Sequence, residues 1–73
     1  MERGICLNWP AVVKEAIKRR KQSKLTQKQF AVLAGVSLPT IVRFERQEEN
    51  ITLNSIFAIL KVVGLLAPNE SIP

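Results

Sequence analysis

The 73-residue sequence predicts an all-α fold, a compact domain of four to five helices. Apolar residues recur at spacings of three and four, which is typical of helices that bury one face. An Asn, Ser or Thr stands directly before each of four such segments, where its side chain can cap a helix. A chain of this length supports one small core, so we expect residues 1–73 to form a single domain.

The first predicted helix begins at Trp9, after the N-cap residue Asn8. Pro10 falls in its first turn, where backbone amides have no intrahelical acceptor. Residues 1–8 are an N-terminal extension, in which a short strand at Gly4–Leu7 is an open alternative. Helical spacing predicts an inward side made of Val13, Ala16, Ile17 and Arg20.

Two short helices are predicted next, separated by a glycine. Thr26 and Gln29 form the capping box of the first, and Gly35 ends it, because glycine adopts the left-handed conformation without steric cost. Ser37 caps the second, and Pro39 lies early enough in it to break no backbone bond. The apolar residues expected to face inward are Phe30, Leu33, Ala34, Val36, Ile41 and Phe44.

A fourth helix is predicted after the N-cap residue Thr52, limited by Gly64 or Pro68, with residues 67–73 as a loose tail. We expect one side of it to face the core, namely Leu53, Ile56, Phe57 and Leu60. Further apolar residues lie around its other side, and an exposed apolar surface usually marks an interface. We therefore predict a homodimer interface at Ile59, Val62, Leu65 and Leu66, the alternative being that Ile59 and Val62 only widen the core.

The composition excludes several classes of protein. The chain has no His and one cysteine, Cys6, so we expect no enzyme, internal disulfide, metal site or cofactor. No apolar run approaches the roughly 18 residues that span a bilayer, and we expect a cytoplasmic, nucleoid-associated protein. The formal charge is +5, and residues 11–47 hold nine basic side chains against two acidic ones. This asymmetry favours one charged face that binds a polyanion.

The glycine-containing turn predicts a helix-turn-helix at residues 26–46, in which the second helix enters the major groove of DNA. An ordinary helical hairpin is the alternative. The stretch "LTQKQFAVLAGVSLPTIVRFERQ", Leu25–Gln47, resembles the lambda-repressor/Cro (XRE) family of helix-turn-helix proteins. The features that carry the resemblance are Thr26-Gln27, Ala31, "AGVS" at the turn, and "FE" at Phe44-Glu45.

The resemblance implies a lambda-repressor-like DNA-binding domain and a role for particular residues. Arg20 and Glu45 would form a structural ion pair between the first and third helices. The outward side of the third helix would read bases with Leu38, Pro39, Thr40 and Arg43. Phosphate contacts would come from Thr26, Gln27, Ser37, Arg46, Asn50 and Thr52. The sequence departs from the family where Gln47, Glu48 and Glu49 replace the usual glycine and basic residues.

We therefore expect a sequence-specific regulator of transcription that binds double-stranded DNA, a dimeric repressor on a palindromic operator. The stretch Asn50–Leu65 is similar to that of HipB-type antitoxin-repressors. The alternative function is thus an antitoxin that chiefly binds a HipA-type toxin and represses its own promoter.

Overall fold

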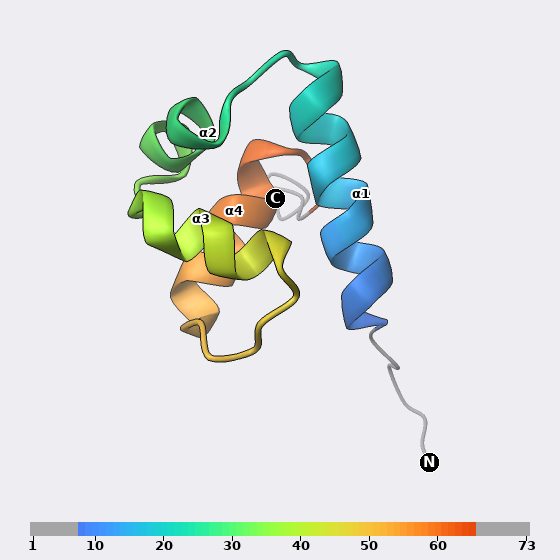
Figure 1. Cartoon of the computed structure of the whole chain (residues 1–73), viewed down its shortest axis with the longest axis vertical. Helices are drawn as coiled ribbons and strands as arrows, with labels where there is room; N and C mark the ends of the chain where they lie inside the picture. Colours follow the sequence, from blue (N-terminus) through green and yellow to red (C-terminus); the bar gives the residue numbers. More distant parts are fainter. Residues whose placement is uncertain (1–7, 66–73) are drawn as a thin grey trace, which may run out of the picture.

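The computed structural model describes residues 8–65, and among these it contains four helices and no strand. The helices are α1 (Trp9–Gln22), α2 (Gln27–Ala34), α3 (Leu38–Glu45) and α4 (Leu53–Val62). Figure 1 shows α1 along one side of the molecule, α2 and α3 together on the other, and α4 behind α3. The predicted all-α fold is confirmed. The N-terminal extension up to Leu7, the tail 67–73 and Leu66 lie outside the described residues.

Each helix begins at the N-cap that the sequence predicted. The side chains of Asn8, Thr26, Ser37 and Thr52 each accept a hydrogen bond from the backbone amide three residues later. Thr26 and Gln29 form a reciprocal capping box. These hydroxyl and amide oxygens satisfy amides that have no intrahelical acceptor, so the helix starts are fixed locally.

The helix ends share one backbone device, a residue in the left-handed conformation just after the helix. Gly35 and Gly64 take this position after α2 and α4, with φ angles of 72° and 78°. After α1 and α3, Lys24 and Gln47 take it, with φ angles of 60° and 68°. Only the two glycines could be predicted from the sequence to take this position, because glycine alone adopts the left-handed conformation without strain.

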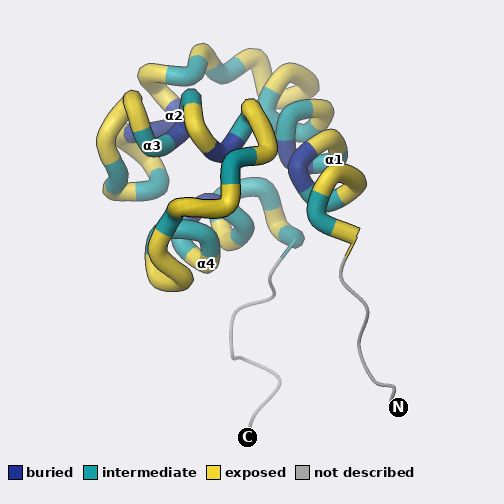
Figure 2. The backbone as a smooth tube through the Cα atoms, turned by 60° about the horizontal axis from the view of Figure 1, so that its bottom comes forward, coloured by how far each residue is buried: buried dark blue, intermediate teal, exposed yellow. Residues whose placement is uncertain are grey.

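The core is small and joins all four helices. Its buried residues are Val13, Ala16, Phe30, Ala31, Ile41, Phe44 and Ile59. In Figure 2 the buried positions lie on helix sides that face one another. Trp9 packs its ring edge-on against Phe44, with ring centroids 5.6 Å apart. The pair α2 and α3 therefore packs against α4, and α3 also packs against α1.

The predicted orientation of α4 is wrong in part: Leu60 packs against the core as expected, and Ile59 and Val62 widen the core, which was the stated alternative. Ile59, expected in a dimer interface, is fully buried, and Val62 and Leu65 are half-buried against the core. Leu53 and Phe57, expected to face inward, are 62% and 41% exposed. Nearly every position of α4 is apolar except the polar Asn54, Ser55 and Lys61, so periodicity defines two apolar sides and does not say which one meets α2.

One position in α2 is also misassigned. Leu33 was expected inside but is 60% exposed, and the neighbouring Val32 is 73% exposed. The inward side of α2 is made instead by Phe30 and Ala31. Because α2 has only eight residues, a single additional apolar residue such as Leu33 is enough to shift the predicted inward side around the helix.

The burial pattern predicts that truncating two aliphatic side chains will affect stability very differently. Ile59→Ala should lower the free energy of unfolding by about 2–5 kcal/mol, because it opens a cavity in a dense core. Leu33→Ala removes an exposed side chain and should change it by less than about 0.5 kcal/mol. Urea titration followed by circular dichroism measures both. A larger loss for Leu33→Ala than for Ile59→Ala would contradict the assigned orientations.

Candidate nucleic-acid interface

The turn between α2 and α3 fixes the two helices at an angle. Gly35 N–H donates to the Val32 carbonyl and Val36 N–H to the Ala31 carbonyl, over 3.1 and 3.0 Å. These bonds satisfy the last carbonyls of α2 while the left-handed Gly35 reverses the chain. Ser37 then caps α3 at once. Two short helices joined by a tight glycine turn form a helix-turn-helix.

α3 carries two different sides. Ile41 and Phe44 are fully buried, which seats the helix on the core. Of the predicted base-reading residues, Leu38, Pro39 and Arg43 are exposed. Thr40, a fourth candidate, is half-buried, and its hydroxyl lies 2.9 Å from that of Ser37. The structure thus presents Leu38, Pro39 and Arg43 to solvent together, with Thr40 partly engaged in the cap.

Three of the predicted phosphate-contacting residues mark helix N-termini. Thr26, Ser37 and Thr52 are exposed, and their hydroxyls cap α2, α3 and α4. Free first-turn amides and the positive end of the helix dipole make such positions suitable for anions. Arg46 and Asn50 are exposed beside them in the chain, after α3 and before α4. The helix N-termini with Arg46 and Asn50 therefore offer hydrogen-bond donors and positive charge of the kind that an anion needs.

Glu45 gathers three donors at the end of α3. Its carboxylate accepts hydrogen bonds from Arg20 Nε at 2.7 Å, Arg20 Nη2 at 3.2 Å and Gln27 Nε2 at 2.9 Å. Arg20 Nη1 also donates to the Leu25 carbonyl at 2.7 Å. The charged side chains are only 11% and 9% exposed. The cluster therefore ties α1, the turn after it, α2 and α3 together.

Gln27 has a role that sequence reasoning missed. It was expected to offer its amide to a phosphate, whereas one N–H of that amide donates to Glu45. The signal was present in the sequence only as the resemblance that paired Arg20 with Glu45. The pairing of Arg20 with Glu45 gives no indication that Gln27 also bonds to Glu45.

Trp9 is a second contact that the sequence did not announce. Its indole Nε1 donates to the backbone carbonyl of Gln47 at 3.1 Å. Gln47 belongs to the segment where the sequence departs from the family that it resembles, and there Glu48 is half-buried and Glu49 exposed. The first residue of α1 thus anchors the chain where it leaves α3.

Arg19 connects α1 to the C-terminal end of α4. Its Nη1 donates to the Val63 carbonyl at 3.0 Å, and its Nε donates to Glu15 at 2.9 Å. This hydrogen bond from Arg19 lowers the pKa of the exposed Glu15 carboxyl. α1 therefore contacts α3 near its first residue and the end of α4 near its last turn.

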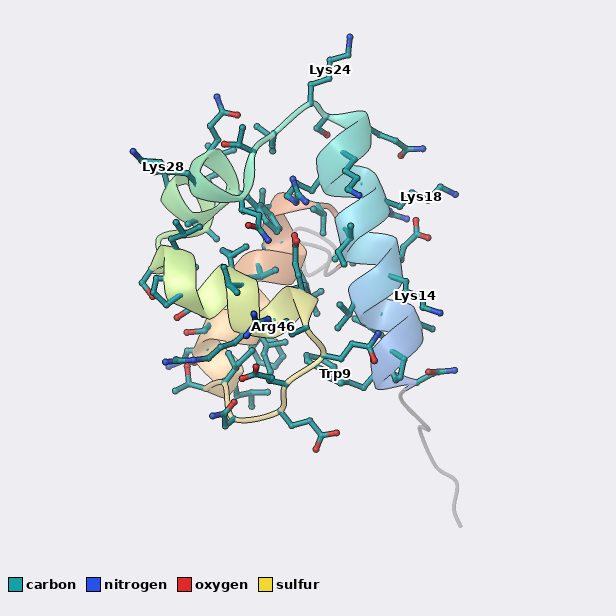
Figure 3. The ribbon with its side chains drawn as sticks, in the orientation of Figure 1. Trp9, Lys14, Lys18, Lys24, Lys28 and Arg46 are labelled. Carbon is teal, nitrogen blue, oxygen red and sulfur yellow. The ribbon has the colours of Figure 1, made fainter. Side chains whose placement is uncertain are left out.

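The basic side chains do not share one face. Figure 3 shows Lys14 and Lys18 projecting from α1 on the side away from α2, whereas Lys28 projects from α2 and Arg46 from the end of α3. The expectation of a single charged face therefore holds only in part, because a charge count along the chain does not say where helices point. Among residues 8–65, no helix is long and apolar enough to cross a bilayer.

Comparison with known proteins points to one family. The sequence model described as Helix-turn-helix matches residues 17–69. An uncharacterized HTH-type transcriptional regulator of Haemophilus influenzae is 37% identical over 54 residues, which cover 74% of this chain and 55% of that relative. The chain thus spans about half the length of the curated relative that it matches.

The Glu45 cluster predicts that two adjacent arginines differ in importance. Arg20→Ala should lower the free energy of unfolding by up to about 3–5 kcal/mol, the range for a fully buried pair, because it leaves the largely buried Glu45 carboxylate without its charged partner. Arg19→Ala should cost about 1 kcal/mol, since its carboxylate partner is 40% exposed. Urea unfolding of the two variants measures the difference. Equal losses would show that the cluster contributes no more than a surface pair.

Proposed function

The chain belongs to the helix-turn-helix family, of the lambda-repressor/Cro (XRE) type, and on this premise we propose that it is a sequence-specific, double-stranded DNA-binding transcriptional regulator. The observation that carries the proposal is the division of α3. Its inner side is fixed by Ile41, Phe44 and the Glu45 cluster, while Leu38, Pro39 and Arg43 face solvent. A helix seated on the core, with the exposed guanidinium of Arg43 on its outer side, suits the major groove.

The proposed roles on DNA divide by chemistry. Arg43 reads bases, because its guanidinium can donate two hydrogen bonds to guanine O6 and N7. Leu38 and Pro39 contribute apolar contacts, for which a thymine methyl is the natural partner, and Thr40 contributes its methyl or hydroxyl. The phosphate contacts come from the helix N-termini capped by Thr26, Ser37 and Thr52, with Gln27, Arg46 and Asn50 beside them.

We further propose that the protein acts as a dimeric repressor on a palindromic operator in the cytoplasm. Three outward side chains and a partly engaged threonine make a small reading surface. Two copies that read half-sites about 34 Å apart would multiply the affinity of such a surface. Glu48 and Glu49 would repel phosphate, so the segment after α3 is expected to face away from the duplex or to weaken backbone binding there.

A second function is favoured by the apolar surface of α2. Val32 and Leu33 are 73% and 60% exposed, which suits a protein that holds a partner, such as an antitoxin bound to a HipA-type toxin. A chain of this kind would be stabilised by co-expression with the product of an adjacent toxin gene. A regulator without a toxin would show no such dependence.

The experiment that tests the main proposal is selection of bound duplexes from a random library at two salt concentrations. Recovery of a palindrome with half-site centres about one helical turn apart supports a dimeric operator-binding protein. Recovery of no motif, with binding that disappears at moderate salt, would leave only non-specific attraction to phosphates and would overturn the proposal.

Two arginines of α3 and its end should separate base reading from phosphate binding. Arg43→Ala should weaken binding to the selected operator by about 1–3 kcal/mol and relax one base preference. Arg46→Ala should weaken operator and random duplexes about equally and reduce the salt dependence by about one phosphate contact. Titrations by fluorescence anisotropy on both duplexes measure these effects. Loss on random DNA as large as on operator for Arg43→Ala would remove it from the base-reading residues.

A further inference from the structure

An apolar groove lies between the first turns of α1 and the outer side of α4, and none of the residues that line it belongs to α3. Trp9 and Val12 form one wall, and Leu53, Ile56, Phe57 and Leu60 form the other. The groove encloses about 350 Å³. Leu53 and Phe57 stand at its edge, 62% and 41% exposed. Within the described residues, nothing covers this surface.

The apolar residues that line the groove form a regular helical stripe, in which Leu53 and Phe57 are exposed and Ile56 and Leu60 are half-buried. Leu53, Ile56, Phe57 and Leu60 are spaced by three, one and three residues, which places them on one side of α4. The opposite side of the same helix is already used, because Ile59 is fully buried in the core. α4 therefore has a second apolar side that is partly exposed, although Leu60 also touches the core, and such a stripe can pack against another helix.

Opposite charges stand at the two ends of this stripe. Glu49 lines the groove just before α4 begins, and its exposed carboxylate marks the N-terminal end. Lys61 is exposed in the last turn of α4, one residue beyond Leu60 and one turn beyond Phe57. An antiparallel pairing of two such helices would place each Glu49 near the Lys61 of the other, whereas a parallel pairing would place like charges together.

We propose that a second copy of this chain occupies the groove, with the two α4 helices packed antiparallel about a two-fold axis. A two-fold interface uses the same patch on both copies, so the patch must complement itself. This patch does so twice, because it carries both projecting side chains, Leu53 and Phe57, and the hollow between α1 and α4. Its ends carry opposite charges. A nucleic acid is a poor occupant, since the charges balance and the walls are apolar.

This interface adds a dimer contact to the proposed function. Its role in reading a palindrome rests on that function, whereas the contact itself does not. It replaces the interface expected at Ile59, which the core has already buried. Because the groove is formed by α1 and α4, Leu38, Pro39 and Arg43 on α3 stay free in the dimer. Self-association can be measured without DNA, so the dimer and the DNA-binding function can fail separately.

The test is a reciprocal charge reversal followed by sedimentation velocity of the full chain, without DNA, over a range of concentrations. Glu49→Lys alone and Lys61→Glu alone each put like charges at both ends of the interface and should raise the dimer dissociation constant about tenfold. An equimolar mixture of the two variants restores both opposite-charge contacts and should form a heterodimer of about wild-type affinity. The double variant Glu49→Lys/Lys61→Glu should also recover.

Two leucines of nearly equal exposure supply the matched control. Leu53→Glu places a charge in the proposed interface and should raise the dissociation constant about a hundredfold. Leu33→Glu places the same charge on the apolar surface of α2, 60% exposed, and should leave it unchanged. Circular dichroism checks that both variants fold.

Several results would overturn the proposal. A wild-type chain that stays monomeric at all concentrations would show that no second copy fills the groove. Dimers that survive Leu53→Glu but not Leu33→Glu would move the interface to α2. A mixture that dimerises no better than its two components would exclude the antiparallel arrangement.

Discussion

The Glu45 carboxylate is the point on which the arrangement of the helix-turn-helix depends. It lies at the end of α3 and accepts hydrogen bonds from Arg20 of α1 and Gln27 of α2, so one side chain connects three helices. The donors occupy the carboxylate while it is almost removed from water, and each charge needs the other there. Apolar packing brings the helices together without choosing a single angle, whereas a forked guanidinium accepts only a narrow geometry. The cluster thus fixes how α3 is presented.

The small core explains why such polar connections matter. Within residues 8–65, seven buried residues form the core that four helices share, and a domain of this size buries a limited share of its surface. Backbone acceptors supply the remaining connections: Trp9 reaches the carbonyl of Gln47, and Arg19 reaches that of Val63. Each of these bonds joins α1 to the chain just after another helix. α1 therefore closes the domain at both of its ends, while the space beside its first turns stays open as the groove.

The sequence predicted what is decided locally, and it predicted packing where a helix has one apolar side, as in α3 with Ile41 and Phe44, but not where a helix has two. The N-caps at Asn8, Thr26, Ser37 and Thr52 and the turn at Gly35 depend on a few neighbouring residues, and all are observed. The rotation of α4 depends on which of two apolar sides meets α2, and no residue within the helix settles that. Left-handed Lys24 and Gln47 were also invisible, because neither residue type signals that conformation. The site followed the same rule: exposed Arg43 was predictable from its place in α3, and the bond from Gln27 to Glu45 was not.

Trp9 has a consequence for how this protein can be observed. It is the chain's single tryptophan, and no tyrosine is present, so one indole dominates the ultraviolet emission. That indole packs against Phe44 in the core, donates a hydrogen bond to the carbonyl of Gln47 just after α3, and lines the groove. Its emission wavelength responds to loss of the core, to movement of the segment after α3 and to exclusion of water from the groove. The native chain therefore carries its own spectroscopic probe, between its core and the open groove, and needs no attached dye.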